Sequence, residues 1–122
     1  MLDHVTFGVS DIERSKAFYD QALRSLGIER MYADASSAGY GANRKAFFWI
    51  SLKGTPQTGA HVAFTTADRE TVDRFHPAAL AAGGRDHGAP GLRPHYHVNY
   101  YGAFVLDPDG HNIEAVCHLK IV

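Results

Sequence analysis

Two histidines stand at the same position of a repeated segment, and imidazoles paired in this way can bind a metal ion. His4 and His61 are 57 residues apart, and the match extends over 24 positions without a gap. The same offset relates Val5 to Val62, Phe7 to Phe64, Phe18 to Phe75, and Gly27 to Gly84. Two copies of a half-domain usually pack about a pseudo-two-fold axis, which brings equivalent residues near that axis together. Two imidazoles meeting there form a candidate site for a divalent metal.

Glu114 is the best candidate for a third ligand. It lies in the apolar segment 112–117, whose composition predicts a buried strand. Glutamate is seldom buried without a partner, and a bound cation would be such a partner. Two imidazoles and one carboxylate leave coordination positions open for substrate, water or O₂, and they do not decide among Fe, Mn, Ni, Zn and Co. The alternative is a solvated Glu114 with both histidines satisfied by hydrogen bonds.

A second group of polar side chains precedes the last two predicted strands. Residues 95–101 contain two imidazoles, three phenols and an amide, which can donate to an oxyanion or move protons near neutral pH. We expect catalytic roles for His97 and for one of Tyr100 and Tyr101, which strand alternation sends to opposite faces. We expect Arg93 and His95 to contact the substrate. The alternative is that these residues are ordinary strand and loop residues exposed to water.

Composition limits the class of protein. The chain has 122 residues, 45% of them hydrophobic, and a net charge of -1 without a long run of either sign. This argues against nucleic acid or an anionic membrane as a partner. We find no apolar run that approaches the roughly 20 residues of a membrane span. Cys117 is the only cysteine, so an intrachain disulfide is impossible and a cytoplasmic location is expected.

Periodicity predicts the elements that position the first histidine. Residues 3–9 alternate, so His4 lies on the opposite face of a strand from Phe7. Ser10 and Glu13 form a capping box, which predicts a helix that starts at Ser10 and ends at Gly27. Strands are expected near 28–33, 38–42 and 46–52, followed by a turn-rich join at 53–59.

The second half repeats this pattern with differences. A strand is expected at 60–65, with His61 on its polar face, and a helix at 68–82. Pro77 should kink or break that helix, because proline removes one hydrogen bond and crowds the preceding turn. Residues 86–98 are rich in Gly, Pro and His and predict a loop. Strands near 100–106 and 111–118 should flank a turn at 107–110.

The chain resembles the vicinal oxygen chelate superfamily, which includes glyoxalase I, extradiol dioxygenases, and bleomycin- and fosfomycin-resistance proteins. The resemblance covers the whole chain and rests on three motifs: Asp3-His4-Val5-Thr6-Phe7, Ala60-His61-Val62-Ala63-Phe64, and Asp107-Pro108-Asp109-Gly110-His111-Asn112-Ile113-Glu114. It implies one α+β domain over residues 1–122, built from two βαβββ modules at about 1–54 and 59–122 whose curved sheets enclose a metal-bearing cavity. By position it implies His4, His61 and Glu114 as ligands. It also suggests a homodimer, and it leaves open whether modules pair within or between chains.

The sequence departs from the superfamily pattern at two points. Glyoxalase I-type sites take a fourth ligand from the last strand of the first module, where this chain has Phe48 and Trp49. We expect these two aromatic residues to stack on the substrate. The three-ligand set is more similar to the extradiol dioxygenases, but Phe104 stands where those enzymes have a tyrosine. Its missing hydroxyl argues against catechol cleavage by their usual route.

Two classes of function follow from the sequence. The first is a divalent-metal-dependent enzyme, of dioxygenase or lyase/isomerase type, which acts on a small molecule with vicinal oxygens. The second is a binding protein of the drug-sequestering, bleomycin-resistance type, which holds a small molecule without catalysis. Binding that is indifferent to chelators would favour the second class.

Overall fold

The computed structural model describes residues 1–119, which form two modules of the same architecture. The first contains β1 (Val5–Gly8), α1 (Ile12–Arg24), β2 (Glu29–Ala33), β3 (Ser37–Ala42) and β4 (Lys45–Ser51). The second contains β5 (His61–Thr65), α2 (Arg69–Ala81), β6 (Arg85–Leu92), β7 (Tyr101–Leu106) and β8 (Asn112–Cys117). The sheets have the strand orders β1-β4-β3-β2 and β5-β8-β7-β6, each with a parallel outer pair. The predicted α+β fold of two βαβββ modules is confirmed.

The sequence repeat corresponds to a structural repeat. Both helices have 13 residues, and α2 begins and ends 57 residues after α1. Asp11 and Asp68 cap the two helices, each accepting a hydrogen bond from the backbone N–H three residues on. The predicted cap at Ser10 was therefore wrong by one residue. The Ser10 hydroxyl instead donates to Asp109 at 2.5 Å and links the two modules.

The predicted loop at 86–98 was wrong, because its first part is the edge strand β6. This strand pairs with β7 alone, and its register shifts on either side of Gly88. An edge strand accommodates Pro90 because one side of its backbone needs no ladder partner. Glycine and proline therefore made an irregular strand resemble a loop.

Of the kink or break predicted at Pro77, the break was wrong. The helix α2 continues to Ala81, and Phe75 and Ala79 on either side of the proline are fully buried. Burial of these side chains against sheet and core stabilises the helix and offsets the lost hydrogen bond.

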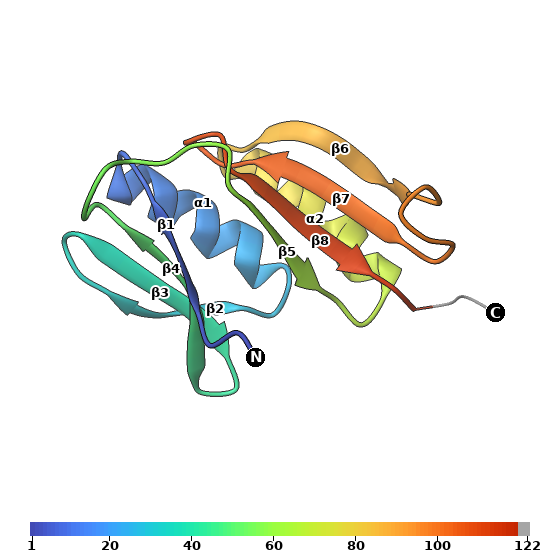
Figure 1. Ribbon diagram of the computed structural model, residues 1–122, viewed down its shortest axis with the longest axis horizontal. Coiled ribbons are helices and arrows are strands. Elements are labelled where there is room, and N and C mark those ends of the chain that lie inside the picture. Colours follow the sequence, from blue (N-terminus) through green and yellow to red (C-terminus); the bar gives the residue numbers. More distant parts are fainter. Residues whose placement is uncertain (120–122) are drawn as a thin grey trace.

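The two modules lie side by side and share one hydrophobic core. Figure 1 shows α2 behind β7 and β8, against which it packs, while α1 contacts α2 at the junction. The Phe48 and Phe64 rings meet edge to face across the modules, with centroids 5.5 Å apart. At β1 the predicted alternation is confirmed, since Phe7 is buried while Thr6 and His4, which directly precedes the strand, are exposed. Within residues 1–119, neither helix is long and apolar enough to cross a membrane.

The turn between β7 and β8 fastens one module to the other. The Tyr19 hydroxyl of α1 donates to Asp107 at 2.5 Å, and Asp107 also accepts two backbone N–H groups of its own turn. His111 is fully buried; its Nδ1 accepts the Ala60 N–H at 3.1 Å, so its Nε2 donates to the Gly8 carbonyl at 3.1 Å. The predicted turn is confirmed, and its side chains form the polar seam between the modules.

We predict that Tyr19→Phe destabilises the protein. Burial, followed by the neighbouring Asp107, raises the pKa of Tyr19 well above its ordinary value, so the phenol stays a neutral donor. Without it, Asp107, which is 1% exposed, loses one of its three donors. The expected loss is about 1.5–3 kcal/mol in the free energy of unfolding, measured in urea.

The matched control is Tyr32→Phe, which removes the same kind of bond to the exposed Asp34. It should leave stability nearly unchanged, because both groups are already exposed to water. Equal losses of unfolding free energy in Tyr19→Phe and Tyr32→Phe would show that the buried hydrogen bond at the seam stabilises the protein no more than an exposed one.

Candidate functional site

The centre of the candidate site is a buried carboxylate on β8. Glu114 is 1% exposed and points away from the core, in alternation with its buried neighbours Ile113 and Ala115. Its Oε1 lies 2.9 Å from Nε2 of His61 on β5, and the Tyr100 hydroxyl donates to its Oε2. The His61 side chain is 50% exposed. The site therefore combines a buried anion with an imidazole that a ligand can reach.

Small residues make room for these contacts. A Cβ on Gly102 would lie 3.2 Å from Glu114 Oε2 and 3.2 Å from the Tyr100 ring. Burial, followed by the contact with Glu114, raises the pKa of Tyr100 above its ordinary value. The phenol therefore stays protonated at neutral pH and remains a donor to the carboxylate.

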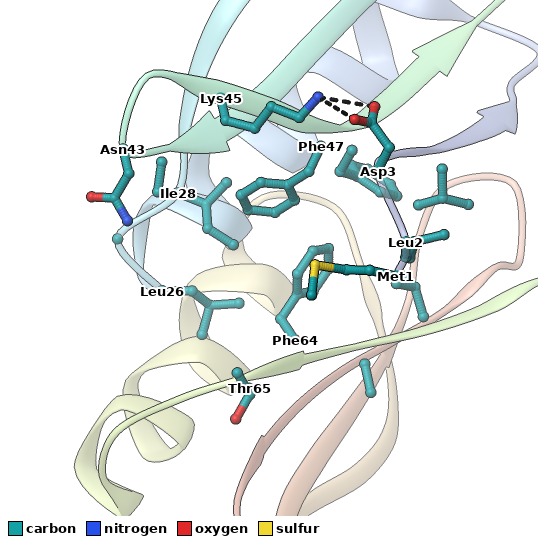
Figure 2. A pocket seen from close by; sticks show the side chains of 16 residues that line it. Met1, Leu2, Asp3, Leu26, Ile28, Asn43, Lys45, Phe47, Phe64 and Thr65 are labelled. Atoms are coloured by element: carbon teal, nitrogen blue, oxygen red, sulfur yellow. Dashed lines mark hydrogen bonds and ion pairs between the residues drawn. The ribbon is translucent and has the colours of Figure 1, made fainter.

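His4 lies apart from this pair within one chain. Its Nδ1 is 2.7 Å from Oδ1 of Asp3, which also contacts Lys45 Nζ at 2.9 Å (Figure 2). These two neighbours lower the pKa of Asp3. Among residues 1–119, no three His, Cys, Asp or Glu side chains gather closely enough to hold a metal. The structure thus brings His61 and Glu114 together and leaves the three-ligand set a prediction.

Trp49 is the structural equivalent of Glu114 in the first module. Thr6 pairs with Trp49 in the β1–β4 register, and Ala63, its repeat partner, pairs with Glu114 in the β5–β8 register. The indole lies close over Gly39, where an added Cβ would be 2.7 Å from it. Trp49 is half-buried and pairs with Thr6, on the face of the sheet opposite to Phe48, and its substrate contact stays a prediction.

Phe48 lies on the other side of the sheet from Glu114, and its substrate contact stays a prediction. The residue is fully buried and packs edge to face against Phe7 and Phe64. Strand alternation explains this placement, because Phe48 points to the helices and its neighbour Trp49 to the opposite face.

The structure separates the two candidate tyrosines. Tyr100 contacts Glu114, whereas the Tyr101 hydroxyl donates at 2.5 Å to Asp73 of α2 on the other side of the sheet. The Tyr101 hydroxyl thus points away from Glu114, and a catalytic role for it stays a prediction. His97 packs on the edge of the Tyr100 ring, with centroids 5.5 Å apart, and contacts His118 at 2.6 Å. It does not touch Glu114.

Arg93 and His95 line a small pocket of about 310 Å³ on the same side of the sheet as Glu114. Phe104 and Asn112, which share the face of Glu114 by alternation, also line it. Sequence reasoning missed Asn112, although it stands two residues before Glu114 and therefore on the same face.

A larger pocket of about 780 Å³ lies elsewhere, at the junction between the start of β1 and the end of β5 (Figure 2). Its walls are mainly apolar and include Leu26, Ile28, Phe47 and Phe64. Neither His61 nor Glu114 lines it. Asp3 and Lys45 also line it, but they pair with each other. We assign the chemistry to the site at Glu114, where a carboxylate, an imidazole and a phenol converge.

We predict that Tyr100→Phe destabilises the protein by about 1–2 kcal/mol, because it takes one of two hydrogen-bond partners from a buried carboxylate. Urea unfolding at neutral pH measures the loss. Because the folded-state pKa of Tyr100 is raised, this contribution is complete below about pH 10 and is lost as the pH rises above it. Tyr101→Phe is the control, and it should change little because Asp73 is exposed. A neutral outcome for Tyr100→Phe would contradict the role assigned to its hydroxyl.

Comparisons with known proteins agree with this architecture. Residues 1–115 match the family model described as Glyoxalase/Bleomycin resistance protein/Dioxygenase superfamily. A glyoxalase/bleomycin resistance protein from Albidiferax ferrireducens T118 is 36% identical, with a TM-score of 0.84 and coverage of 96% of this chain and 98% of that one. None of the curated proteins matches the chain.

Two more distant structures share the fold. The fosfomycin resistance protein FosX from Mesorhizobium loti is 21% identical, with a TM-score of 0.66 and coverage of 96% of this chain and 91% of that one. A lactoylglutathione lyase from Agrobacterium tumefaciens is 14% identical, with a TM-score of 0.71 and coverage of 96% and 92%.

Proposed function

We propose that this chain, which belongs to the glyoxalase/bleomycin resistance protein/dioxygenase superfamily, is a divalent-metal-dependent enzyme acting on a small molecule with vicinal oxygens. The contact between His61 and the buried Glu114 carries the proposal. A carboxylate removed from water needs a cation or several donors, and here an imidazole and a phenol lie beside it. One imidazole nitrogen and one carboxylate are ligand types that Fe, Mn, Ni, Zn and Co accept.

The third ligand in this proposal is His4 of a second copy of the chain. Within residues 1–119, β1 pairs only with β4 and β5 pairs only with β8, so each has a free edge. His4 is exposed directly before β1, and among the described residues of its own chain it does not join His61 and Glu114 in a three-ligand group. In a two-fold dimer, the free edge of β1 can approach the free edge of β5 in the partner. That approach would bring His4 to the accessible side of His61.

The residues around Glu114 have separate roles in the proposed reaction. The metal, when bound, supplies a Lewis acid that stabilises negative charge on a substrate oxygen. Tyr100 orients the Glu114 carboxylate through its hydroxyl. His97, exposed and in contact with His118, donates or accepts a proton at the substrate. Phe104 pairs with Glu114 in the register of β7 and β8 and has no hydroxyl, which favours a lyase or isomerase over catechol cleavage.

The metal content of purified protein tests this proposal. We expect about one divalent ion per chain by elemental analysis, lost on dialysis against EDTA together with activity. Glu114→Gln and His61→Ala should each hold far less metal after dialysis against buffer. His76→Ala is the matched control, because this histidine also contacts a carboxylate, Asp86, but on the surface of α2. Folded wild-type protein that never retains a stoichiometric metal would refute the proposal.

The origin of His4 can be tested by mixing two inactive variants. If each site takes His4 from one chain and Glu114 from the other, a mixed dimer of His4→Ala and Glu114→Ala chains contains one intact site. Co-expressed chains with different affinity tags should therefore recover about half of the metal of the wild-type dimer, whereas each variant alone recovers none. No recovery in purified mixed dimers would place all ligands in one chain.

A binding protein without catalysis is the second candidate, and the apolar pocket of about 780 Å³ favours it. A cavity of this volume is large enough for a drug-sized molecule. Ligand affinity that survives both EDTA and Glu114→Gln but falls after Phe64→Ala would favour sequestration over catalysis.

A further inference from the structure

The Arg93 guanidinium is held in a fixed place beside the candidate site. It lies over the Phe104 ring at 5.4 Å, and its Nη2 donates to the Ala89 carbonyl at 2.7 Å. Two glycines of β6 make room for it. A Cβ on Gly88 would lie 3.1 Å from Nη2, and one on Gly91 would lie 3.0 Å from Nη1. Side chains at these positions would crowd the guanidinium away from the ring.

This cation has no anionic partner in the described part of the chain. Within residues 1–119, no carboxylate lies within ion-pair distance of Arg93. Stacking and one carbonyl use only part of the guanidinium, which has five N–H donors. The remaining donors suit an oxyanion, since arginine can bind a carboxylate or phosphonate through two parallel hydrogen bonds.

The pocket of about 310 Å³ is lined by Arg93, Phe104 and Asn112. The candidate metal ligands do not line it themselves, but they are the strand neighbours of two of its lining residues. Phe104, under the guanidinium, pairs in register with Glu114, and Asn112 pairs with His61. The Asn112 Oδ1 atom is buried without a hydrogen-bond partner although its residue lines the pocket. An unsatisfied buried acceptor is costly, and a ligand hydroxyl would satisfy it.

We infer that Arg93 binds an oxyanion of the substrate, so that the substrate class is a small hydroxylated carboxylate or phosphonate. The inference rests on the proposed function, because it names the substrate of the same site. The vicinal oxygens approach His61 and Glu114, the oxyanion binds to the guanidinium across the Phe104 ring, and a hydroxyl donates to Asn112. Arg93 thereby determines specificity and takes no part in bond cleavage.

Binding of simple probes to metal-free protein tests this inference without an activity measurement. The probes are phenylphosphonate, benzoate and the neutral benzyl alcohol. Their binding is followed by NMR, through the Nε–Hε signals of the arginine side chains. We expect at least one of the two anions to bind more tightly than benzyl alcohol and to shift the Arg93 signal. Arg93→Gln should weaken anion binding about tenfold or more, because it removes a charge-assisted hydrogen bond. Arg93→Lys should retain part of the affinity, because it keeps the charge.

Arg69→Gln is the matched control. Arg69 stacks on the Tyr101 ring at 4.9 Å, a similar geometry on the helix side of the sheet, and its loss should leave anion binding unchanged. Equal anion affinity in wild type and Arg93→Gln, or anions that bind no better than benzyl alcohol, would overturn the inference. Tighter binding of one anion would identify the head group.

The proposed metal site and the anion site can fail separately. Anion binding should persist in metal-free Glu114→Gln, because Arg93 acts without the metal. A protein that never holds metal but binds anions through Arg93 would refute only the metal proposal. A protein that holds metal at Glu114 but binds no anion would refute only the Arg93 assignment.

Discussion

A carboxylate buried in the middle of a sheet is costly, and the arrangement around Glu114 reduces that cost. In the β5–β8 register, Ala63 stands opposite Glu114, and His61 stands one step further along the same face. The small side chain of Ala63 leaves the space through which the imidazole approaches Glu114 Oε1. On the other side, Gly102 leaves the space through which Tyr100 donates to Oε2. Small residues directly beside the carboxylate thus allow larger polar residues to reach it from a distance.

The placement of Glu114 also depends on the seam between the modules. The segment from Asp107 to Glu114 has two parts with different tasks. Its first part binds Tyr19 through Asp107 and the end of β1 through His111, so the turn is tied to the first module. Its second part is the start of β8, which carries Asn112 and Glu114 on the candidate site. Because Glu114 is only three positions after His111, the contacts that join the modules also set the position of the carboxylate.

The sequence predicts best what local periodicity controls. Alternation and turn residues predicted the repeat, its strand faces and the turn at Asp107. Glu114 was identified as a candidate ligand because an acidic residue is unusual in an apolar strand. The side of the sheet on which Phe48 lies could not be predicted, because an aromatic run does not show which face is buried until the register is known. The strand β6 was missed because tertiary pairing overrides the preferences of Gly and Pro at a sheet edge.

Contacts between distant segments could not be derived from periodicity. Alternation places His4 and His61 on equivalent faces, but it does not determine whether those faces meet within one chain or between two. In the same way, nothing in the sequence near Arg93 showed that Gly88 and Gly91 would make room for its guanidinium, because that space depends on the irregular register of β6 against β7.

The duplication explains why the two modules do not carry equal sites. Each module has a histidine near the start of its first strand, but at the position of Glu114 the first module has Trp49. The indole covers Gly39 and supplies no ligand atom.

The first module can therefore contribute an imidazole and an aromatic wall, and the second an imidazole and a carboxylate. Neither module alone offers three ligands. Two copies of the first module would supply two imidazoles and no carboxylate, whereas the diverged modules together supply two imidazoles and one carboxylate. The complementarity is what supports a site shared by a first module and a second module, and the free edges of β1 and β5 are the surfaces across which such a site would form.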